Sequence, residues 1–514
     1  MSRLGQVTLG LAAASLCVSA PAFAQKAKDE MRLAINDMFP TVDPYVFPLD
    51  EAGVWYRILY QPLAAFTESD QKFVPAIAKS WTIPQPGVYE FELRDDIYFH
   101  SGNKLTADDV VYTLNFFADP KQKIRFKARY DWFKPVEKLG EYKVRITAKD
   151  PSPADMATLA YRSRIFDKAI LSKMEDHYED YGRVSGSGTG PYRLVSIDKQ
   201  KVIFEKYPGV RDGYQRAAVG RYVGIHIPDE QSQIAQIMTG GVDALRNISP
   251  DNARMIGERP GMAIADLNSG DEIYITLDAA GRSKSKVMTD QRVRKALMMA
   301  INRDELIKHI IPGHGTAVKL NSICFDWTVD CAMSTTPPAY DPEGAKKLLA
   351  EAGYPNGFDL EFNVHEPIRE IGEAIAGELR KVGIRASVAA LPLAVYVKKR
   401  GEGEFTAFNG FYPTGAQPDA GNLYDFFFGA DRDYYQDETI HALAKKAQVE
   451  YDKDKRTALY KQMVDRVNTM NYILPVASLP TAYAMTKEVK IMPDAFSYAG
   501  VYLNDLVWDD YKGK

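Results

Sequence analysis

Two cysteines are the clearest candidates for chemistry in this chain of 514 residues. Cys324 and Cys331 lie seven positions apart, and the third cysteine, Cys17, falls in the leader segment described below. In an oxidising compartment, two such cysteines are most simply joined by a disulfide that closes a short loop. Two free buried thiols are the alternative. A zinc site would need two further ligands, and no histidine lies within the loop.

The other residues of catalytic type form no recognisable arrangement. His309 and His314 are the closest pair of the seven histidines, and two imidazoles cannot complete a metal site. The metalloprotease, phosphate-loop and serine-nucleophile motifs are absent from the sequence. We therefore expect a binding protein that carries no cofactor. A secreted hydrolase of unfamiliar motif and a carrier of nickel or haem are rival hypotheses, and the small number of histidines argues against the carrier.

The first 24 residues have the features of a cleaved export signal. Arg3 supplies a positive charge, Leu9 to Val18 is apolar, and an A-F-A triplet resembles a cleavage site before Gln25. The apolar run is shorter than the roughly 20 residues that span a bilayer. Lipidation at Cys17 is the alternative, but the residue before it is not small. The sequence therefore predicts a mature protein that is released into the periplasm.

Length and composition describe a soluble chain built from several parts. Hydrophobic residues make up 46% and charged residues 26%, which is typical of globular proteins. The net charge is −4, and the chain has neither the basic excess nor the basic block of a nucleic-acid-binding protein. We therefore expect no nucleic-acid partner. At about 150 residues per domain, the length suggests roughly three lobes.

Strand patterns dominate the first half of the chain, whereas helices and strands alternate in the second. Val88 to Leu93 alternates with a period of two, and Thr106 is a suitable N-cap for the helix that follows. A long helix over Asp290 to Ile311 is followed by a helix that begins at Asp341-Pro342, and then by strand, helix and strand. This alternation predicts an α/β fold from about residue 290 to 480.

Several stretches of the chain form recognisable sequence blocks. They are Y-E-F-E-L-R at 89–94 with F-H-S-G-N-K-L-T-A-D-D-V at 99–110, G-T-G-P-Y at 188–192 with V-I-F-E-K at 202–206, D-Q-R-V-R-K-A-L at 290–297 with A-I-N-R at 300–303, Y-D-P-E-G-A-K-K-L-L-A-E-A-G at 340–353, and E-L-R-K-V-G-I at 378–384. Together, and in this order, they resemble the signature blocks of the extracytoplasmic solute-binding proteins of ABC transporters, dipeptide/oligopeptide/nickel family. The resemblance covers essentially the whole mature chain.

The resemblance implies an α/β, periplasmic-binding-protein-like fold with two main lobes, a hinge and an extra peripheral lobe. Lobe I would be discontinuous and comprise residues 25–67, 188–283 and 481–514, with the peripheral lobe at 68–187 and lobe II at 284–480. Strands near 278–286 and 476–482 would form the hinge. Solute would bind in the cleft between the lobes and stabilise the closed form.

The resemblance also points to the residues that would contact the solute. The segment from Phe408 to Asn422 is similar to the part of the family that faces the cleft. Peptide receptors of the family carry Gly-Trp, two further residues and then an aspartate that pairs with the peptide's amino terminus. Here Phe411 stands at the tryptophan position and Thr414 at the aspartate position. Asp419 or another acid could supply the carboxylate instead, or the ligand has no ammonium group to anchor; Asp419 could equally be a turn residue. The ligand-binding candidates are Tyr45, Phe411, Tyr412, Thr414, Asp419 and Asn422.

These expectations together describe a transport receptor. The expected ligand is a small peptide or peptide-like solute, the expected partner is an inner-membrane ABC permease, and the protein is expected to act as a monomer. A non-peptide solute such as an amino-acid–sugar conjugate is the alternative, because it would not need the aspartate that Thr414 replaces. Unmodified di- and tripeptides are expected to bind poorly unless Asp419 reaches the cleft.

Overall fold

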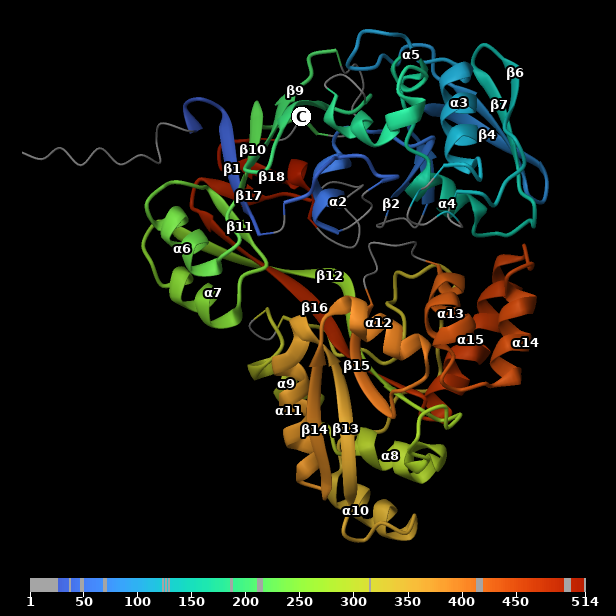
Figure 1. The fold of residues 1–514 in the computed structure, drawn as a ribbon, viewed down its shortest axis with the longest axis vertical. Helices are drawn as coiled ribbons and strands as arrows, with labels where there is room; N and C mark the ends of the chain where they lie inside the picture. Colours follow the sequence, from blue (N-terminus) through green and yellow to red (C-terminus); the bar gives the residue numbers. More distant parts are fainter. Residues whose placement is uncertain are drawn as a thin grey trace, which may run out of the picture.

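The computed structural model describes residues 26–36, 38–46, 50–67, 72–122, 124, 127, 130–184, 188–209, 216–313, 316–412, 419–493 and 501–512. The expected leader over residues 1–24 and the candidate Thr414 lie outside these described residues. Figure 1 shows an elongated molecule in which lobe I and the peripheral lobe form the upper part and lobe II forms the lower part.

Ten of the described strands form one continuous sheet that runs through both main lobes. Its order is β14 (Ile384–Leu391), β13 (Phe358–His365), β15 (Ala407–Tyr412), β12 (Met262–Leu277), β16 (Ile473–Thr486), β11 (Ala244–Arg246), β1 (Glu30–Ile35), β10 (Arg221–His226), β9 (Lys201–Lys206) and β8 (Tyr192–Ile197). Strands β13, β14 and β15 run parallel in lobe II, and β1 runs parallel to β10 and β11 in lobe I.

The two longest strands, β12 and β16, connect the lobes (Figure 1). They pair antiparallel along most of their length. The pairing is irregular at two places, because the register shifts between Asn268 and Glu272 and again between Ile273 and Tyr274. The sequence expectation of a hinge strand near 278–286 is corrected here, since β12 ends at Leu277 and a loop follows. The expectation near 476–482 coincides with the middle of β16.

Lobe II has a separate hydrophobic core on each face of this sheet. Because successive side chains of a strand point to opposite faces, Ile273 and Ile275 join one core while Tyr274 joins the other. The first core packs under α8 (Gln291–Met299), α9 (Arg303–His309), α10 (Pro342–Glu351) and α11 (Arg369–Arg380), and the second under α12 (Leu393–Gly401), α13 (Ala420–Phe428), α14 (Glu438–Ala447) and α15 (Lys453–Thr469). Short 3-10 turns lie at η3 (Val287–Thr289), η4 (Glu366–Ile368) and η5 (Ala430–Arg432).

The single helix expected over 290–311 is two helices in the structure. Helix α8 ends at Met299, and Asn302 begins α9 by accepting a hydrogen bond from the backbone N–H of Glu305 at 3.2 Å. A side-chain amide that caps a new helix end offers the backbone an alternative to continuing the old helix. The apolar periodicity of this segment extends across the break and so concealed it.

Lobe I and the peripheral lobe share an aromatic-rich core in the upper part of the molecule. Lobe I adds α2 (Asp50–Tyr56), α6 (Glu230–Met238), α7 (Pro250–Gly257), η6 (Leu503–Asp505) and the pair β17 (Val489–Ile491) and β18 (Leu506–Trp508). The peripheral lobe carries the four-stranded sheet β4 (Ala78–Gln85), β5 (Val88–Leu93), β7 (Lys143–Thr147) and β6 (Glu137–Gly140), with α3 (Ala107–Ala118), α4 (Asp155–Arg162), α5 (Lys168–Leu171) and η2 (Glu175–Arg183). The hairpin β2 (Ala64–Thr67) and β3 (Lys72–Pro75) lies beside it.

Candidate functional site

A cavity of about 830 Å³ lies between lobe I and lobe II. Its lobe I wall includes Asn36, directly after β1, and Asn247, directly after β11. Its lobe II wall includes residues 366–371, directly after β13, and Phe411 near the end of β15. In open α/β sheets, ligands bind outside the carboxyl ends of the parallel strands. Strand ends of this kind from both lobes therefore face this cavity.

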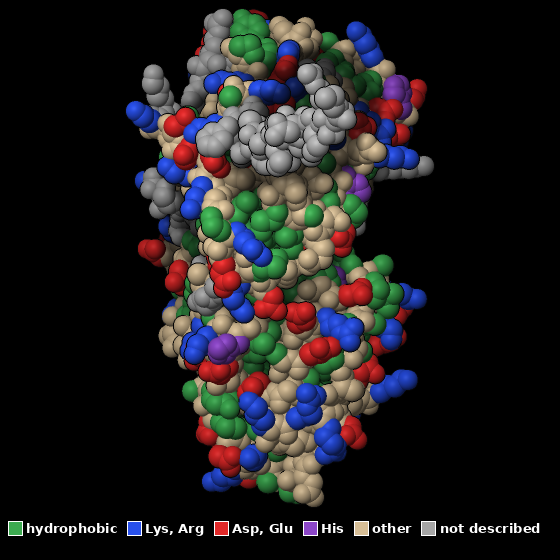
Figure 2. Space-filling view, turned by 90° about the vertical axis from the view of Figure 1, so that its left-hand side faces the viewer, with side chains coloured by type: hydrophobic (Ala, Val, Ile, Leu, Met, Phe, Trp, Pro, Cys, Tyr) green, Lys and Arg blue, Asp and Glu red, His purple; other side chains and the backbone are tan. Residues whose placement is uncertain are grey.

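The cavity brings charges of both signs together from both lobes. Arg246 of lobe I donates to the hydroxyl of Tyr483 at 3.2 Å, and Arg369 of lobe II donates from Nε to Glu373 at 2.7 Å. Asp271, Glu366 and Glu370 supply carboxylates to the lining. Figure 2 views the molecule from the side of α6, α7, α9 and α11, and shows acidic and basic side chains interspersed on that face rather than separated by sign. The lining therefore suits a polar solute that carries both charges.

Phe411 is the predicted site residue that lines the cavity. It is half-buried, and its ring stacks on His365 with centroids 5.3 Å apart and planes 27° from parallel. Burial lowers the pKa of His365, so this imidazole is neutral at neutral pH and offers an uncharged ring. The pair forms an apolar wall beside the charged residues of the cavity.

Tyr412 points to the opposite face of β15, because alternate strand residues face opposite sides. Its ring packs against Phe426 with centroids 4.5 Å apart, and its side chain is 3% exposed. Asn422 donates from its amide to the Tyr412 hydroxyl at 2.8 Å. Tyr412 and Asn422 therefore lie together, but Tyr412 and Phe411 do not form one surface as the sequence suggested.

Asp419 has a structural role that differs from the expected one. It is the N-cap of α13 and accepts a hydrogen bond from the backbone N–H of Gly421 at 2.8 Å. Both of its oxygens also accept from the guanidinium of Arg456, at 2.9 and 2.8 Å, and the residue is 3% exposed. The expectation that Asp419 holds a solute ammonium is corrected, because its carboxylate is enclosed and already paired.

Tyr45 also lies in a core rather than in the cavity. Its ring stacks on Phe117 with centroids 3.6 Å apart, and its hydroxyl donates to the carbonyl of Arg164 at 2.6 Å. The residue is 1% exposed. The expectation that Tyr45 contacts the ligand is therefore corrected. Its side chain joins the core of lobe I to the peripheral lobe.

One buried acid was not anticipated from the sequence. Glu272 lies across from Tyr412 on β12, beside the first register shift of the hinge, and is fully buried. In the described part of the chain, neither of its carboxylate oxygens has a hydrogen-bonding partner. Burial raises the pKa of Glu272 well above its ordinary value.

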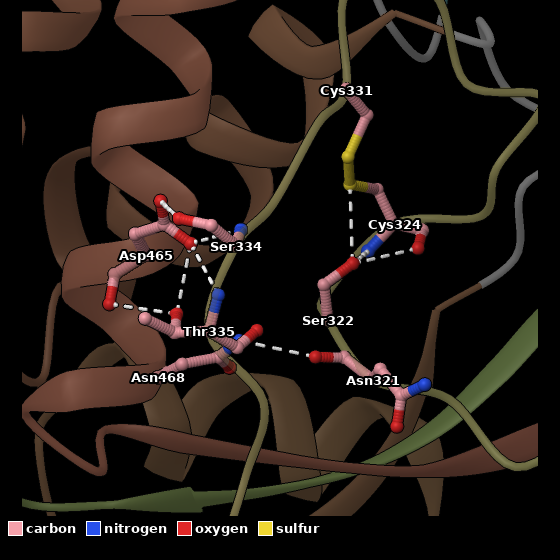
Figure 3. Close-up of a disulfide and its surroundings, with 8 residues drawn as sticks. All are labelled: Asn321, Ser322, Cys324, Cys331, Ser334, Thr335, Asp465 and Asn468. Atoms are coloured by element: carbon pink, nitrogen blue, oxygen red, sulfur yellow. Dashed lines mark hydrogen bonds between the residues drawn. A yellow bond between two sulfur atoms is a disulfide. The ribbon is translucent and has the colours of Figure 1, made fainter.

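The cysteine pair lies in lobe II, where the structure joins Cys324 to Cys331 (Figure 3). Their Cα atoms are 6.5 Å apart. Within the loop that they close, Val329 packs against Phe66 and Tyr161 of the upper part of the molecule. The chain after the loop is fastened to α15, since Asp465 accepts from the backbone N–H groups of Ser334 and Thr335 at 2.7 and 2.8 Å. The loop is therefore a second contact between lobe II and the upper lobes.

Neither a metal-binding cluster nor a membrane-spanning helix is found among the described residues. No group of three or more His, Cys, Asp or Glu side chains among them is arranged to hold a metal ion. Within the same residues, no helix combines the length and the apolar character needed to cross a membrane.

Comparison with solved structures defines the class of fold. The NikA protein of Brucella suis, solved with Fe(III)-EDTA, superposes with a TM-score of 0.81 at 20% identity over 93% of this chain and all of that one. A dipeptide-binding protein of Pseudoalteromonas sp. SM9913, solved with Met-Leu, has a TM-score of 0.76 at 19% identity over 93% of this chain and all of that one. The fold is therefore that of the lobed periplasmic binding proteins, as the sequence predicted.

Sequence comparison then gives the family. The model of the bacterial extracellular solute-binding proteins, family 5, matches residues 72–435, which is more than half of the chain. Heme-binding protein A of Haemophilus influenzae is 26% identical over 483 residues, covering 86% of each chain. The glutathione-binding protein GsiB of Escherichia coli K12 is 28% identical over 407 residues, covering 76% of this chain and 74% of that one. This protein belongs to the family 5 extracellular solute-binding proteins, and is an extracytoplasmic binding receptor rather than an enzyme.

Proposed function

We propose that this protein captures a peptide or peptide-like solute in the cavity between its lobes and delivers it to an inner-membrane ABC permease. In this proposal the protein is exported by a cleavable signal peptide, works in the periplasm and acts as a monomer. Two relatives are named for glutathione and heme, and one solved neighbour holds the dipeptide Met-Leu. The ligands of the relatives thus differ widely, and the proposal for this chain depends on its own cavity.

One observation carries the proposal: the lining of the cavity matches the chemistry of a zwitterion. Arg246 comes from lobe I and Arg369 from lobe II, so a solute carboxylate held by both would draw the lobes together. The carboxylates of Glu366 and Glu370 lie on the same lining and can receive a cationic group. Phe411 adds an apolar surface for a side chain.

A solute without a free α-ammonium is the second candidate, and one observation favours it. Asp419 is occupied by Arg456, so it offers no carboxylate to a peptide's amino terminus. An amino-acid–sugar conjugate, or another solute whose amine is blocked or exposed to water, would not need such a partner. This candidate uses the same cavity and the same receptor role.

Native mass spectrometry of protein purified without refolding tests the function directly. We expect a bound solute of a few hundred daltons that leaves the protein on denaturation, because a cavity of this size encloses a ligand of that order. Calorimetry with the released solute should give a 1:1 complex. A peptide mass would support the first candidate and a non-peptide mass the second. Absence of any 1:1 complex with peptides, conjugates or the native extract would contradict the receptor role of this cavity.

Phe411→Ala provides the matched test of the site. Losing the ring should weaken solute binding by about tenfold or more, because a buried aromatic contact contributes 1–3 kcal/mol. Ile83→Ala is the control, because it also truncates an apolar side chain but lies far from the cavity. Ile83 is 49% exposed on the peripheral lobe. Equal solute affinities of Phe411→Ala and Ile83→Ala would show that the solute binds outside this cavity.

A further inference from the structure

The disulfide loop of lobe II has a tip that reaches the upper part of the molecule. Val329 lies in this tip and packs against a small apolar cluster formed by Phe66 of β2 with Ala160 and Tyr161 of α4. Figure 1 shows β2 and α4 on the side of the upper part that faces α13 and α15, away from the connecting strands β12 and β16. Because the members of the cluster belong to different lobes, this contact is lost when lobe II moves away from the upper lobes.

The tip is held in one shape by lobe II itself. The carbonyl of Val329 accepts from the backbone N–H of Ala420 at 3.0 Å, and the hydroxyl of Thr457 donates to Asp330 at 2.9 Å. The guanidinium of Arg456 contacts the other oxygen of Asp330. Asp330 has a φ of 59°, which is unfavourable for a residue with a side chain and persists only where its surroundings enforce it. With the disulfide closing the loop at its base, Val329 is presented in a fixed position.

A further contact between the same parts of the molecule lies at the connection between α14 and α15. Tyr451 lies in this connection. Burial and then the charge of Asp155, at the start of α4, raise the pKa of Tyr451 to about 12. Such an effect weakens with distance, so Tyr451 lies near Asp155. Tyr89 of the peripheral lobe donates its hydroxyl to the same carboxylate at 3.2 Å. Helix α4 therefore faces lobe II at both of its ends.

We propose that the disulfide loop is a latch that holds lobe II against the upper lobes before the solute arrives. Two strands with an irregular register connect the lobes, so contacts away from them contribute directly to the balance between open and closed forms. Opening would expose Val329 and its apolar cluster to water, which is unfavourable. The disulfide fixes the shape of the tip, so the latch depends on the oxidised bond. Its effect on solute release rests on the proposed receptor function, whereas its effect on lobe closure does not.

Val329→Ser tests the latch, because it replaces the apolar contact by a polar side chain. Val195→Ser is the matched control, since Val195 is 38% exposed on β8, the edge strand of the large sheet in lobe I. Small-angle X-ray scattering without solute measures the radius of gyration. We expect Val329→Ser to have a larger radius than the wild type and Val195→Ser, with circular dichroism unchanged. Val329→Thr, which is nearly isosteric, gives the same comparison if the serine variant does not fold. Equal radii of the folded proteins would overturn the proposal.

The role of the disulfide is tested by the same measurement. Cys324 and Cys331 are replaced together by alanine, in the wild type and in Val329→Ser. If the bond acts through the tip, its removal should enlarge the wild type and should have little further effect in Val329→Ser, because changes that act through one contact are not additive. An equal enlargement in both backgrounds would show that the bond acts independently of Val329 and would overturn the latch.

Solute binding then connects the latch to the receptor function. Calorimetry with trialanine should show about fivefold weaker binding to Val329→Ser than to the wild type and Val195→Ser, because a smaller fraction of the variant is closed. Absence of trialanine binding to all three proteins would count against the peptide proposal, while the scattering measurement would still decide on the latch. Equal affinities with equal radii would reject the latch and leave the receptor function standing. Equal affinities despite a larger radius would reject the role of the latch in solute capture.

Discussion

Two of the buried arginine sites in the described part of lobe II differ in their charge balance. Arg456 is 3% exposed at its side chain and lies between the carboxylates of Asp419 and Asp330. Burial alone would lower the pKa of Arg456, but these two acids raise it above its ordinary value. Arg400 and Arg432 are packed around Phe426, and neither forms a close ion pair with the described residues. Burial and the charge of Arg400 lower the pKa of Arg432, whereas the charge of Asp431 opposes this shift.

The difference separates an arginine that joins segments through ion pairs from arginines that pack on an aromatic ring. An arginine enclosed by two acids ties distant segments together, in this case the disulfide loop, the start of α13 and α15. Burial alone therefore does not indicate the role of a charged residue, whereas its set of partners does.

Replacing the enclosed arginine should give the largest effect. Arg456→Met leaves Asp419 and Asp330 buried without a cation, which should lower the free energy of unfolding by about 3–5 kcal/mol. Urea unfolding followed by circular dichroism measures this. Asp419→Asn on the Arg456→Met background should restore part of the stability, because an asparagine can still cap α13. A loss below about 1 kcal/mol would show that the ion pair is not structural.

A buried acid in lobe I extends the comparison to negative charge. Asp43 is fully buried, and burial raises its pKa to about 7, although the backbone N–H groups of Tyr45 and Val46 donate to it. Its pKa is higher in the folded state than in the unfolded state, so the free energy of unfolding falls as the pH rises from about 4 to about 7. The slope is roughly 1.4 kcal/mol per pH unit, which would amount to about 3–4 kcal/mol at pH 7.

Asp43→Asn keeps an acceptor for both backbone groups and removes the ionisation. The stability of the variant relative to the wild type should therefore increase from pH 4 to pH 7 and level off above pH 7. Melting curves of both proteins across this range measure the difference. A constant difference would mean that Asp43 is ionised in the folded protein despite its burial.

Removing the disulfide should have an intermediate effect. Replacing Cys324 and Cys331 together by alanine should lower the free energy of unfolding by about 2–3 kcal/mol, because the bond closes a short loop in the unfolded chain. Asp330 lies in that loop and contacts Arg456, so the effects of the cysteine and arginine changes should not be additive. Non-reducing peptide mapping of the exported protein tests the bond itself, and two alkylatable thiols would contradict it.

Changing Arg432 should have the smallest effect on stability. Arg432→Gln should change the free energy of unfolding by less than about 1 kcal/mol, since loss of the contact with Phe426 is offset by relief from repulsion by Arg400. Urea unfolding in chloride buffer measures this beside Arg456→Met. A loss comparable to that of Arg456→Met would show that Arg432 is structural and would erase the contrast between the two sites.

Local patterns predicted many elements of the fold. Thr106 caps α3 in a capping box with Asp109, and Asp341-Pro342 begins α10, as the sequence indicated. These features depend on residues within one helical turn. The hinge was misplaced because the end of β12 at Leu277 depends on pairing with β15 and β16, which are more than 100 residues away.

The site was predicted less well, for the same physical reason. Phe411 was identified, and the alternation of strand residues could have separated it from Tyr412 beforehand. Asn36 and Glu366 follow strands that the sequence reveals, so their place at strand ends was a usable signal. The partner of Asp419 could not be anticipated, because Arg456 lies 37 positions away on another helix.

The register shifts of the hinge have a mechanical consequence. Pro480 lies opposite Asn268 and Pro475 opposite Tyr274, so each proline of β16 adjoins one of the two shifts. A proline has no N–H, so β16 cannot donate a backbone hydrogen bond from these two positions, which adjoin the register shifts. Rotation of one lobe against the other at these two positions would strain few hydrogen bonds between β12 and β16. The β12–β16 connection between the lobes should therefore twist most easily at its two register shifts. We expect the backbone amides beside these shifts to exchange with deuterium faster than those of the paired segments on either side.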